Sequence, residues 1–451
     1  MGRLFGTDGV RGIANTNLTC EQAMNIGKAA AIVLKNDQVP KPTFLIGKDT
    51  RISGDMLEGA LIAGLCSAGA DVKLIGVVPT PAVAYLIEKY HADAGIMISA
   101  SHNTYEYNGI KIFNEDGYKL PDDLEDQIEQ IILNNDITSS FLPKHNSIGT
   151  VQRIDTAVPD YIEHVVSSID FPLTGLKIAI DCANGSASAT AKPLFEKLGA
   201  ECYMLHNNPN GVNINQSCGS THMESLISYV LSNELDAGLA FDGDADRCLS
   251  VSNHGTVIDG DYILAICAAD MKSKKLLKKD TVAGTVMTNM GFNKFCRDNN
   301  INFVSTNVGD RYVLEAMLRE GYNIGGEQSG HIIFLDHSTT GDGQLTGAKL
   351  LSLLNRRDAK LSSLSTLMEH YPQILINVEI SHSGKVHFYT DKEIKKEIKR
   401  IENILGDRGR ILLRVSGTEP LARIMLEGEN YDEICLLANE AAELVKNRLN
   451  D

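Results

Sequence analysis

The sequence predicts an α/β fold, with three similar α/β domains of mainly parallel mixed sheets and a smaller C-terminal α+β domain. Three observations support this prediction. A strand–helix–strand pattern occurs three times at long intervals, and the pattern changes after about residue 370. The chain has 451 residues, which is enough for two to four domains.

The repeated pattern is that of a βαβ unit. Short apolar runs that read as buried strands flank one helical segment in each repeat. In the first repeat, strands 43–46 and 71–75 flank a helix at 55–68. In the second, strands 177–180 and 201–205 flank a helix that ends at Leu198. In the third, strands 281–284 and 301–304 flank a helix at 291–299. A strand, a helix and a second strand at this spacing predict a mainly parallel sheet.

The C-terminal part has a different order of elements. We expect a strand, a helix, two strands around a tight loop and a final helix, at 373–380, 391–405, 410–415, 422–427 and 431–448. Polar stretches near 142–146 and the Tyr371-Pro372 step are typical of domain boundaries. The expected domains are therefore 1–155, 156–252, 253–370 and 371–451.

Composition excludes several classes of protein. Hydrophobic residues make up 43% of the chain and charged residues 22%, as in ordinary globular proteins. The net charge of −16 argues against nucleic acid as a partner. No apolar run approaches the roughly 20 residues of a membrane span, and the N-terminus has no signal core. We expect a cytoplasmic protein with no membrane partner.

The nine cysteines are scattered, and none forms a Cys-x-x-Cys pair. Most lie in apolar surroundings, as reduced core thiols do. We therefore expect neither disulfides nor a zinc site.

Two segments point to phosphoryl transfer. Ser101 follows an apolar run in Ile98-Ser99-Ala100-Ser101-His102-Asn103, and we expect it to be exposed on a turn. Asp242, Asp244 and Asp246 alternate along the chain before Arg247. Oxygen ligands at this spacing favour Mg²⁺ or Ca²⁺ over zinc, and a serine that carries a phosphoryl group needs such a cation beside it.

Each segment also has a simpler interpretation. Ser-His-Asn is common in surface turns. The aspartates could open a calcium loop, but the glycine and glutamate that such a loop requires are replaced by Arg247 and Asn253. A solvated acidic turn fits poorly between the apolar runs 239–241 and 248–251, where unneutralised carboxylates would repel one another.

An anionic substrate needs a local basic cluster on an acidic protein. The candidates are Arg11, Lys111, Arg247, Arg414 and Arg423. The last two flank a loop with hydroxyls and a glycine, Ser416-Gly417-Thr418, which suits a phosphate anchor. A second glycine-rich loop, residues 325–331, carries Glu327, Ser329 and His331 and suits sugar hydroxyls. Taken singly, either loop could be a plain turn.

Four such loops, one in each expected domain, resemble those of the α-D-phosphohexomutase family over essentially the whole chain. Further matching segments are Phe5–Gly12, Gly211–Asn215 with Cys218–His222, and Val308–Tyr312. These segments are most similar to those of the members that act on glucosamine phosphates. Mannose- and glucose-directed members typically have a Lys-Thr-Gly-His-type segment near the third and Met in place of Gln328.

The resemblance implies four domains around a central cleft and interconversion of glucosamine 6-phosphate and 1-phosphate, on the route to UDP-N-acetylglucosamine. It also implies a phosphoserine at Ser101, one Mg²⁺ held by Asp242, Asp244, Asp246 and the serine phosphate, and a hexose 1,6-bisphosphate as intermediate and activator. A homodimer is common in the family, but the sequence leaves the oligomeric state open.

The resemblance assigns roles residue by residue. Glu327 and Ser329 would contact sugar hydroxyls. The non-reacting phosphate would be held by Arg414, Ser416, Gly417, Thr418 and Arg423. Arg11 and Arg247 would serve the transferring phosphoryl group, and Lys111 and His331 would be the acid and base in an order that the sequence leaves open.

The chain departs from the family pattern at two positions. Thr104 stands where the family usually has proline, which frees a backbone N–H and a φ angle. Ala245 stands where the family usually has glycine, so we expect a negative φ there. Neither change removes a ligand.

Three alternatives remain on sequence grounds. The first is a phosphomannomutase or phosphoglucomutase of the same family. The second is a Mg²⁺-dependent sugar phosphatase with Asp242 as nucleophile, and the third is a non-catalytic sugar-phosphate sensor. Retained phosphate on Ser101 would distinguish the mutases from the other two.

Overall fold

The fold was examined in a computed structural model, which describes residues 4–6, 8–36, 38–134, 142–415 and 421–449. The chain forms two compact units. One comprises Met1–Met287 with Ile301–Leu367, and the other comprises Thr288–Asn300 with Met368–Asp451. No helix of the described residues is both long enough and apolar enough to cross a membrane.

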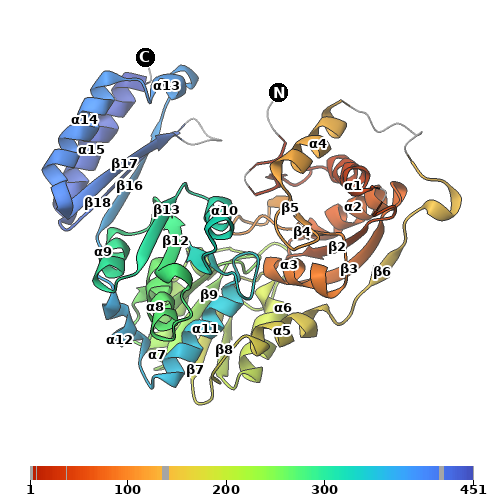
Figure 1. The fold of residues 1–451 in the computed structure, drawn as a ribbon, viewed down its shortest axis with the longest axis horizontal. Coiled ribbons are helices and arrows are strands. Elements are labelled where there is room, and N and C mark those ends of the chain that lie inside the picture. The colour runs from red at the N-terminus through yellow and green to blue at the C-terminus, as the bar shows by residue number, and fades with distance from the viewer. Residues whose placement is uncertain (1–3, 7, 37, 135–141, 416–420, 450–451) are drawn as a thin grey trace. The chain divides into compact units, whose positions relative to one another are not determined.

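The first sheet of the larger unit, which lies in the red to yellow part of the ribbon in Figure 1, has six strands. Their order is β1 (Val10–Ile13), β5 (Tyr107–Asn114), β4 (Ala94–Ile98), β2 (Thr43–Lys48), β3 (Asp71–Val77) and β6 (Val151–Arg153). The strands from β4 to β6 are parallel, and β5 and β1 run antiparallel to their neighbours. The helices are α1 (Cys20–Leu34), α2 (Gly54–Ser67), α3 (Thr80–Lys89) and α4 (Asp122–Leu133).

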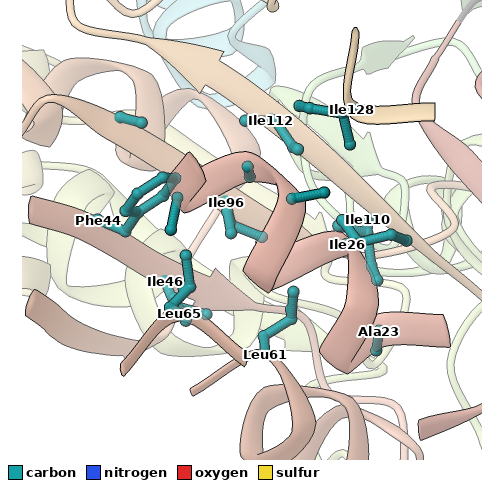
Figure 2. Close-up of a cluster of buried hydrophobic side chains, with 14 of the residues drawn as sticks. Ala23, Ile26, Phe44, Ile46, Leu61, Leu65, Ile96, Ile110, Ile112 and Ile128 are labelled. Atoms are coloured by element: carbon teal, nitrogen blue, oxygen red, sulfur yellow. The ribbon is translucent and has the colours of Figure 1, made fainter. Parts of the chain in front are cut away.

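A large apolar core lies between this sheet and the helices α1, α2 and α4 (Figure 2). Alternate residues of β2, Phe44 and Ile46, join Ile96 of β4 in this core, and Leu61 and Leu65 of α2 pack against them. All five side chains are fully buried. Burial of one such side chain stabilises a fold by roughly 1.5–3 kcal/mol, so this core fixes the sheet whose strand ends carry the site.

Two smaller sheets follow in the same unit. The second has the order β11 (Val257–Ile258), β10 (Cys248–Ser252), β9 (Ala237–Phe241), β7 (Lys177–Asp181) and β8 (Glu201–Leu205), with helices α5 (Ala157–Ser167), α6 (Ala187–Lys197) and α7 (Glu224–Ser232). The third has the order β13 (Asn302–Thr306), β12 (Thr281–Thr285), β14 (Ile324–Gly326) and β15 (Ile332–Phe334), with helices α8 (Gly260–Ser273), α10 (Asp310–Glu320), α11 (Gly343–Arg356) and α12 (Leu361–Leu364).

The smaller unit has one antiparallel sheet in the order β16 (Gln373–Glu379), β18 (Leu421–Gly428) and β17 (Gly409–Val415). Its helices are α9 (Met290–Asp298), α13 (His382–His387), α14 (Lys392–Leu405) and α15 (Tyr431–Leu449). Short 3₁₀ turns occur at His145–Ser147, Gly219–Thr221, Lys278–Asp280, Ser365–Leu367 and Gly406–Arg408. Three mixed α/β sheets and a smaller α+β part confirm the predicted fold class.

One connection recurs in all three α/β sheets. A strand that is parallel to a neighbour leads through a loop into an antiparallel strand beside it: β4 into β5, β9 into β10, and β14 into β15. These loops contain Ser101, the aspartate triplet and Glu327–His331 respectively. The three loops predicted to carry the chemistry are therefore the same topological feature in three sheets.

Candidate active site

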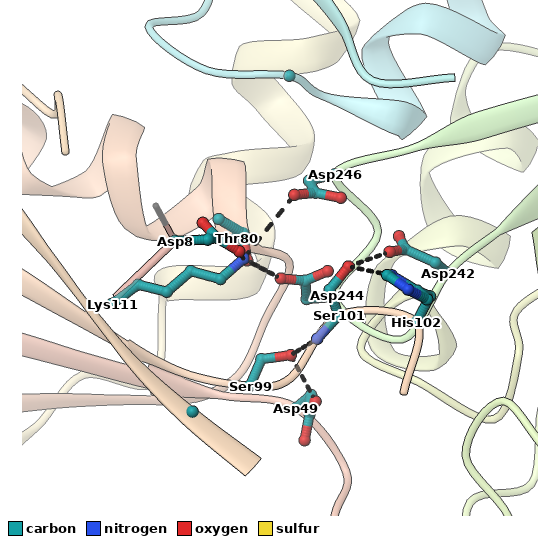
Figure 3. Close-up of polar contacts among 12 residues, drawn as sticks. Asp8, Asp49, Thr80, Ser99, Ser101, His102, Lys111, Asp242, Asp244 and Asp246 are labelled. Carbon is teal, nitrogen blue, oxygen red and sulfur yellow. Dashed lines mark hydrogen bonds and ion pairs between the residues drawn. The ribbon is translucent and has the colours of Figure 1, made fainter. Parts of the chain in front are cut away.

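Ser101 lies directly after the buried strand β4, in a loop held from both sides. Its backbone N–H donates to Ser99 Oγ at 3.0 Å, and Ser99 Oγ donates to Asp49 Oδ2 at 2.6 Å (Figure 3). Its carbonyl oxygen accepts from Arg51 at 2.9 Å and from Asn215 Nδ2 at 2.8 Å. Residue 101 has φ +53°, a conformation that this network of hydrogen bonds stabilises.

Arg51 is the main anchor of this loop. Its guanidinium is fully buried, pairs with Asp49 at 2.8 Å, and donates to the carbonyl groups of residues 101, 103, 104 and 107. Neither Asp49 nor Arg51 was singled out from the sequence. The sequence signal for them is an Asp-x-Arg pattern at the end of a buried strand, because two opposite charges at such a place are expected to pair with each other.

The expectation that Ser101 is exposed is wrong, because only 1% of the residue is accessible. The aspartate loop covers it. Ser101 Oγ donates to Asp242 Oδ2 at 2.7 Å (Figure 3). A Cβ on Gly243 would lie 2.5 Å from the Ser101 carbonyl oxygen, so only glycine allows this close approach. The serine and the aspartates thus form one site.

The three aspartates converge as the sequence predicts. Asp242, Asp244 and Asp246 are buried, and each offers a carboxylate oxygen within 4.8 Å of the others. Their Oδ1 atoms are buried and accept no hydrogen bond from any residue that the structure describes. Burial, together with the charges of Asp246 and Asp244, raises the pKa of Asp242 to about 8. Buried oxygens in this arrangement fit a metal ion.

The loop between these aspartates corrects one further expectation. Ala245 has φ +54°, in the left-handed region, and not the negative φ that its identity suggested. Its backbone is held there because its carbonyl oxygen accepts from the N–H of Gly343 at 3.0 Å, at the start of α11. A left-handed alanine costs about 1–2 kcal/mol, so the contacts of the loop outweigh a real strain.

Lys111, on β5, is only 2% accessible and contacts three carboxylates. Its Nζ lies 2.9 Å from Asp244, 3.2 Å from Asp8 and 3.9 Å from Asp246. Burial lowers the pKa of Lys111, but the attraction of Asp244, Asp8 and Asp246 outweighs burial and raises it well above the ordinary lysine range. Lys111 is therefore an ammonium ion at the centre of the site.

His331, the residue just before β15, approaches the same group of charges. Its Nδ1 lies 3.4 Å from Asp246, and its Nε2 accepts from the N–H of Gly341 at 3.1 Å. Burial lowers the pKa of His331, but Asp246 and then Asp310 raise it above the ordinary value overall. Lys111 and His331 thus contact one carboxylate, Asp246, from two different sheets.

Sequence reasoning missed three charged residues that join these groups. Lys119 bridges Asp8 at 2.6 Å and Asp310 at 2.5 Å, and Asp310 lies 3.6 Å from His331 Nε2. When His331 is protonated, charges therefore alternate around a closed ring through Lys111, Asp8, Lys119, Asp310, His331 and Asp246, and Asp244 also pairs with Lys111. Asp8 and Asp310 lie within segments used to recognise the family, and that was the only signal for them.

Two predicted arginines lie at the rim of the site. Arg11 is exposed and pairs with Asp8. Arg247 has a half-buried side chain, 3.8 Å from Asp246 and 3.4 Å from His102 Nδ1. Both guanidinium groups are placed to meet an anion that approaches Ser101.

The predicted sugar loop is tied to its surroundings at two points. Glu327 Oε1 accepts from the N–H of Gly309 at 3.1 Å, and Gln328 Nε2 donates to Asp259 Oδ2 at 3.2 Å. Asp259 also caps the N-terminus of α8, which fixes its carboxylate. Ser329 is exposed. The loop therefore presents Glu327 and Ser329 from a rigid base.

The predicted phosphate loop belongs to the smaller unit. Arg414 on β17 and Arg423 on β18 are cross-strand partners at the ends of the loop, and both are half-buried. Ser416, Gly417 and Thr418 lie outside the described residues.

A second group of metal-ligating side chains, Asp181, His206 and Cys218, has its ligand atoms within 4.8 Å of one another. Asp181 already accepts from Ala183 N, Gly219 N and His206 Nδ1. Burial and then Asp181 raise the pKa of Cys218 to about 12, which disfavours the thiolate that a metal would need. All nine cysteines are free thiols.

Comparison with known proteins covers the whole chain. Four phosphoglucomutase/phosphomannomutase family models match, namely alpha/beta/alpha domains I, II and III at residues 2–138, 159–255 and 259–372, and the C-terminal domain at 375–444. The phosphoglucosamine mutase of Clostridium acetobutylicum is 54% identical over 450 residues, and that of Thermoanaerobacter sp. is 53% identical over 450 residues. Each alignment covers 100% of both chains.

Solved structures share the fold. A phosphoglucomutase/phosphomannomutase family protein from Burkholderia thailandensis superposes with a TM-score of 0.82 at 24% identity, over 99% of this chain and 98% of the other. The Aspergillus fumigatus N-acetylphosphoglucosamine mutase, solved with GlcNAc-6P and magnesium, gives a TM-score of 0.68 at 14% identity, over 99% and 96%.

Proposed function

The chain belongs to the phosphoglucomutase/phosphomannomutase family, and we propose that it interconverts glucosamine 6-phosphate and glucosamine 1-phosphate through a phosphoserine at Ser101. One observation carries the chemistry. The buried Ser101 hydroxyl lies 2.7 Å from Asp242, beside carboxylate oxygens that accept no hydrogen bond from the described residues. The names of the full-length relatives support the choice of substrate.

Asp242, Asp244 and Asp246, with the serine phosphate, would hold one Mg²⁺. When bound, this ion offsets the negative charge of the transferring phosphoryl group. The protein supplies the rest of the charge compensation. Arg247 and Arg11 lie at the rim and would bind equatorial phosphoryl oxygens, while the Lys111 ammonium offsets charge from behind the carboxylates.

The reaction needs two transfers. Ser101 first gives its phosphoryl group to the free hydroxyl of the sugar phosphate, which forms glucosamine 1,6-bisphosphate. The bisphosphate then turns over and returns its other phosphoryl group to Ser101. The same residues serve both transfers, and a hexose 1,6-bisphosphate would restore the phosphoserine if it were lost.

One proton leaves the attacking hydroxyl in each transfer. We assign the exchange of this proton to Lys111 and His331, which both contact Asp246. Because Lys111 is an ammonium ion, it would act only as a donor, and His331 would be the group that takes the proton. Lys111 and His331 are also connected by ion pairs through Asp8, Lys119 and Asp310. A proton that His331 or Lys111 gains or loses therefore changes the electrostatic attraction between that residue and its neighbours in the ring.

The other contacts orient the sugar. We assign Glu327 and Ser329 to its hydroxyl or amino groups, and Arg414, Ser416, Gly417, Thr418 and Arg423 to the non-reacting phosphate.

The domain boundaries that we propose remain 155/156, 252/253 and 370/371.

Selectivity for the amino sugar is tested by kcat/KM for glucosamine, mannose and glucose 6-phosphates side by side, each with its bisphosphate. We expect glucosamine 6-phosphate to be preferred, because a carboxylate near a protonated amino group discriminates against neutral sugars and a mismatched sugar leaves polar groups unsatisfied. A tenfold preference for mannose or glucose 6-phosphate would replace the proposal by the same-family alternative. Release of inorganic phosphate as the main product would favour the phosphatase.

A further inference from the structure

A second cavity of about 350 Å³ lies in the larger unit. It is lined by α8, the C-terminal half of α11, residues 168–170 that follow α5, and residues 334–337 that follow β15. None of its lining residues belongs to the site around Ser101. Ile169, Met271, Phe334 and Leu353 make much of the wall apolar.

The carboxylates in the wall are all paired with cations. Asp270 pairs with Arg356, with Arg357 at 3.1 Å and with Lys274 at 3.2 Å. Asp170 pairs with Lys274 at 3.1 Å. Asp336 pairs with Lys278 at 2.6 Å. The negative charges of the cavity are therefore already compensated.

Lys349 of α11 is the exception among the charged groups of the wall. Its ammonium donates to the carbonyl oxygen of Ser168 at 3.1 Å and lies 5.5 Å from the centre of the Phe334 ring. No carboxylate of the described residues lies within ion-pair distance of it. An ammonium group has three donors, and one is used here. Burial lowers the pKa of this half-buried lysine, because the attraction of Asp170 and Asp336, which are both paired with other lysines, does not offset the loss of solvent.

His337 lines the cavity on the same side. Burial and then the charge of Lys349 lower the pKa of His337, so at neutral pH its ring is uncharged. A neutral imidazole can donate one hydrogen bond without adding a second charge. The cavity thus offers one uncompensated cation, one neutral donor and an apolar wall.

We propose that this cavity binds a small organic anion, with a carboxylate or phosphate headgroup on Lys349 and a short apolar body against Phe334, Met271 and Leu353. The headgroup supplies the counter-ion that Lys349 lacks, and the body buries the apolar wall. The site goes beyond the proposed mutase reaction and does not depend on it.

The full-length protein can be tested with hexanoate, phenyl phosphate, inorganic phosphate and the neutral analogue hexan-1-ol. Binding is measured by calorimetry and by the concentration dependence of Tm. We expect hexanoate or phenyl phosphate to bind, and hexan-1-ol to bind at least tenfold more weakly. Hexanoate alone would identify a carboxylate site, and phenyl phosphate alone a phosphate site. Inorganic phosphate that binds as tightly as phenyl phosphate would overturn the role of the apolar wall.

Lys349→Met keeps the length of the side chain and removes its charge. We expect at least a tenfold loss of anion affinity, with a Tm of the free protein equal to or above that of the wild type. Lys272→Met, on α8 outside the cavity, is the matched control and should bind as the wild type does. Met271→Trp would fill the cavity while keeping Lys349 and should also abolish binding. Unchanged affinity in Lys349→Met, or no binding of either organic anion to the wild type, would overturn the proposal.

Discussion

At the scale of single residues, the site depends on a buried arginine that touches no reacting atom. Arg51 neutralises Asp49 and holds four carbonyl groups of the serine loop. Arg51→Ala would leave the Asp49 carboxylate buried without a counter-ion. We expect a loss of about 3–5 kcal/mol in the free energy of unfolding, measured by urea denaturation. Arg319→Ala removes an exposed ion pair and should change it by less than about 1 kcal/mol. Equal effects of the two changes would contradict the anchoring role of Arg51.

Also at the residue scale, Asp242 should respond to Mg²⁺ in a characteristic way. Without the ion, burial and the charges of Asp246 and Asp244 raise its pKa to about 8, so Asp242→Asn should be as stable as the wild type or more so in excess chelator. With Mg²⁺ at about 100 times its Kd, the wild type should gain about 2.7 kcal/mol, and Asp242→Asn should gain much less. Thermal unfolding in chelator and in Mg²⁺ measures both. Full catalytic activity of the wild type in excess chelator would exclude the metal.

The residues that could be predicted from sequence share one property. Ser101 and the aspartate triplet stand in short contiguous motifs whose spacing carries chemical meaning. Arg51, Lys119 and Asp310 stand far along the chain from their partners, and only the folded chain brings Arg51 to Ser101 and Lys119 to Asp310. The φ of Ala245 was predicted wrongly because residue identity gives only a local preference, whereas the contact with Gly343 decides the backbone.

At the scale of elements, the site depends on how closely the aspartate loop after β9 packs against the serine loop after β4. Gly243→Ala would place a methyl group 2.5 Å from the Ser101 carbonyl oxygen and 2.8 Å from Asn215 Nδ2. We expect a loss of about 1–3 kcal/mol in stability and a large loss of kcat, because the aspartates move away from the serine. Gly59→Ala, in α2 with no neighbour within 4 Å, should instead stabilise by about 0.5–1 kcal/mol. Wild-type kcat in Gly243→Ala would contradict this role of the loop contact.

The strands and helices expected from sequence agree with the structure at this scale, because the length and spacing of apolar residues in each segment favour either a strand or a helix. The strand at Thr43–Lys48 and the helix at Gly54–Ser67 differ from the predicted bounds by one or two residues. The antiparallel return strands after the three site loops could not be placed from periodicity. Each pairs with the strand before it in its own sheet, which residue alternation along the chain does not reveal. An isolated bridge between Arg247 and His331 also joins two of the loops.

At the scale of the whole molecule, three sheets contribute one loop each to a single charged site. Ser101 comes from the first, the aspartates from the second and His331 from the third. Four family models along the chain and relatives identical at 51–54% over nearly all of its length agree with the domain order that the sequence predicted. Such an order is visible in sequence because the first three domains repeat one strand–helix–strand pattern and the last departs from it.

The most direct test is the intact mass of the purified protein after incubation with glucosamine 1,6-bisphosphate and removal of the sugar. Wild type should carry one phosphoryl group, and Ser101→Ala should carry none and have no sustained turnover. Ser329→Ala keeps Ser101 and should remain phosphorylated. Wild type that takes up no phosphoryl group, or Ser101→Ala that retains either the added mass or near-normal activity, would contradict a phosphoserine mechanism at Ser101.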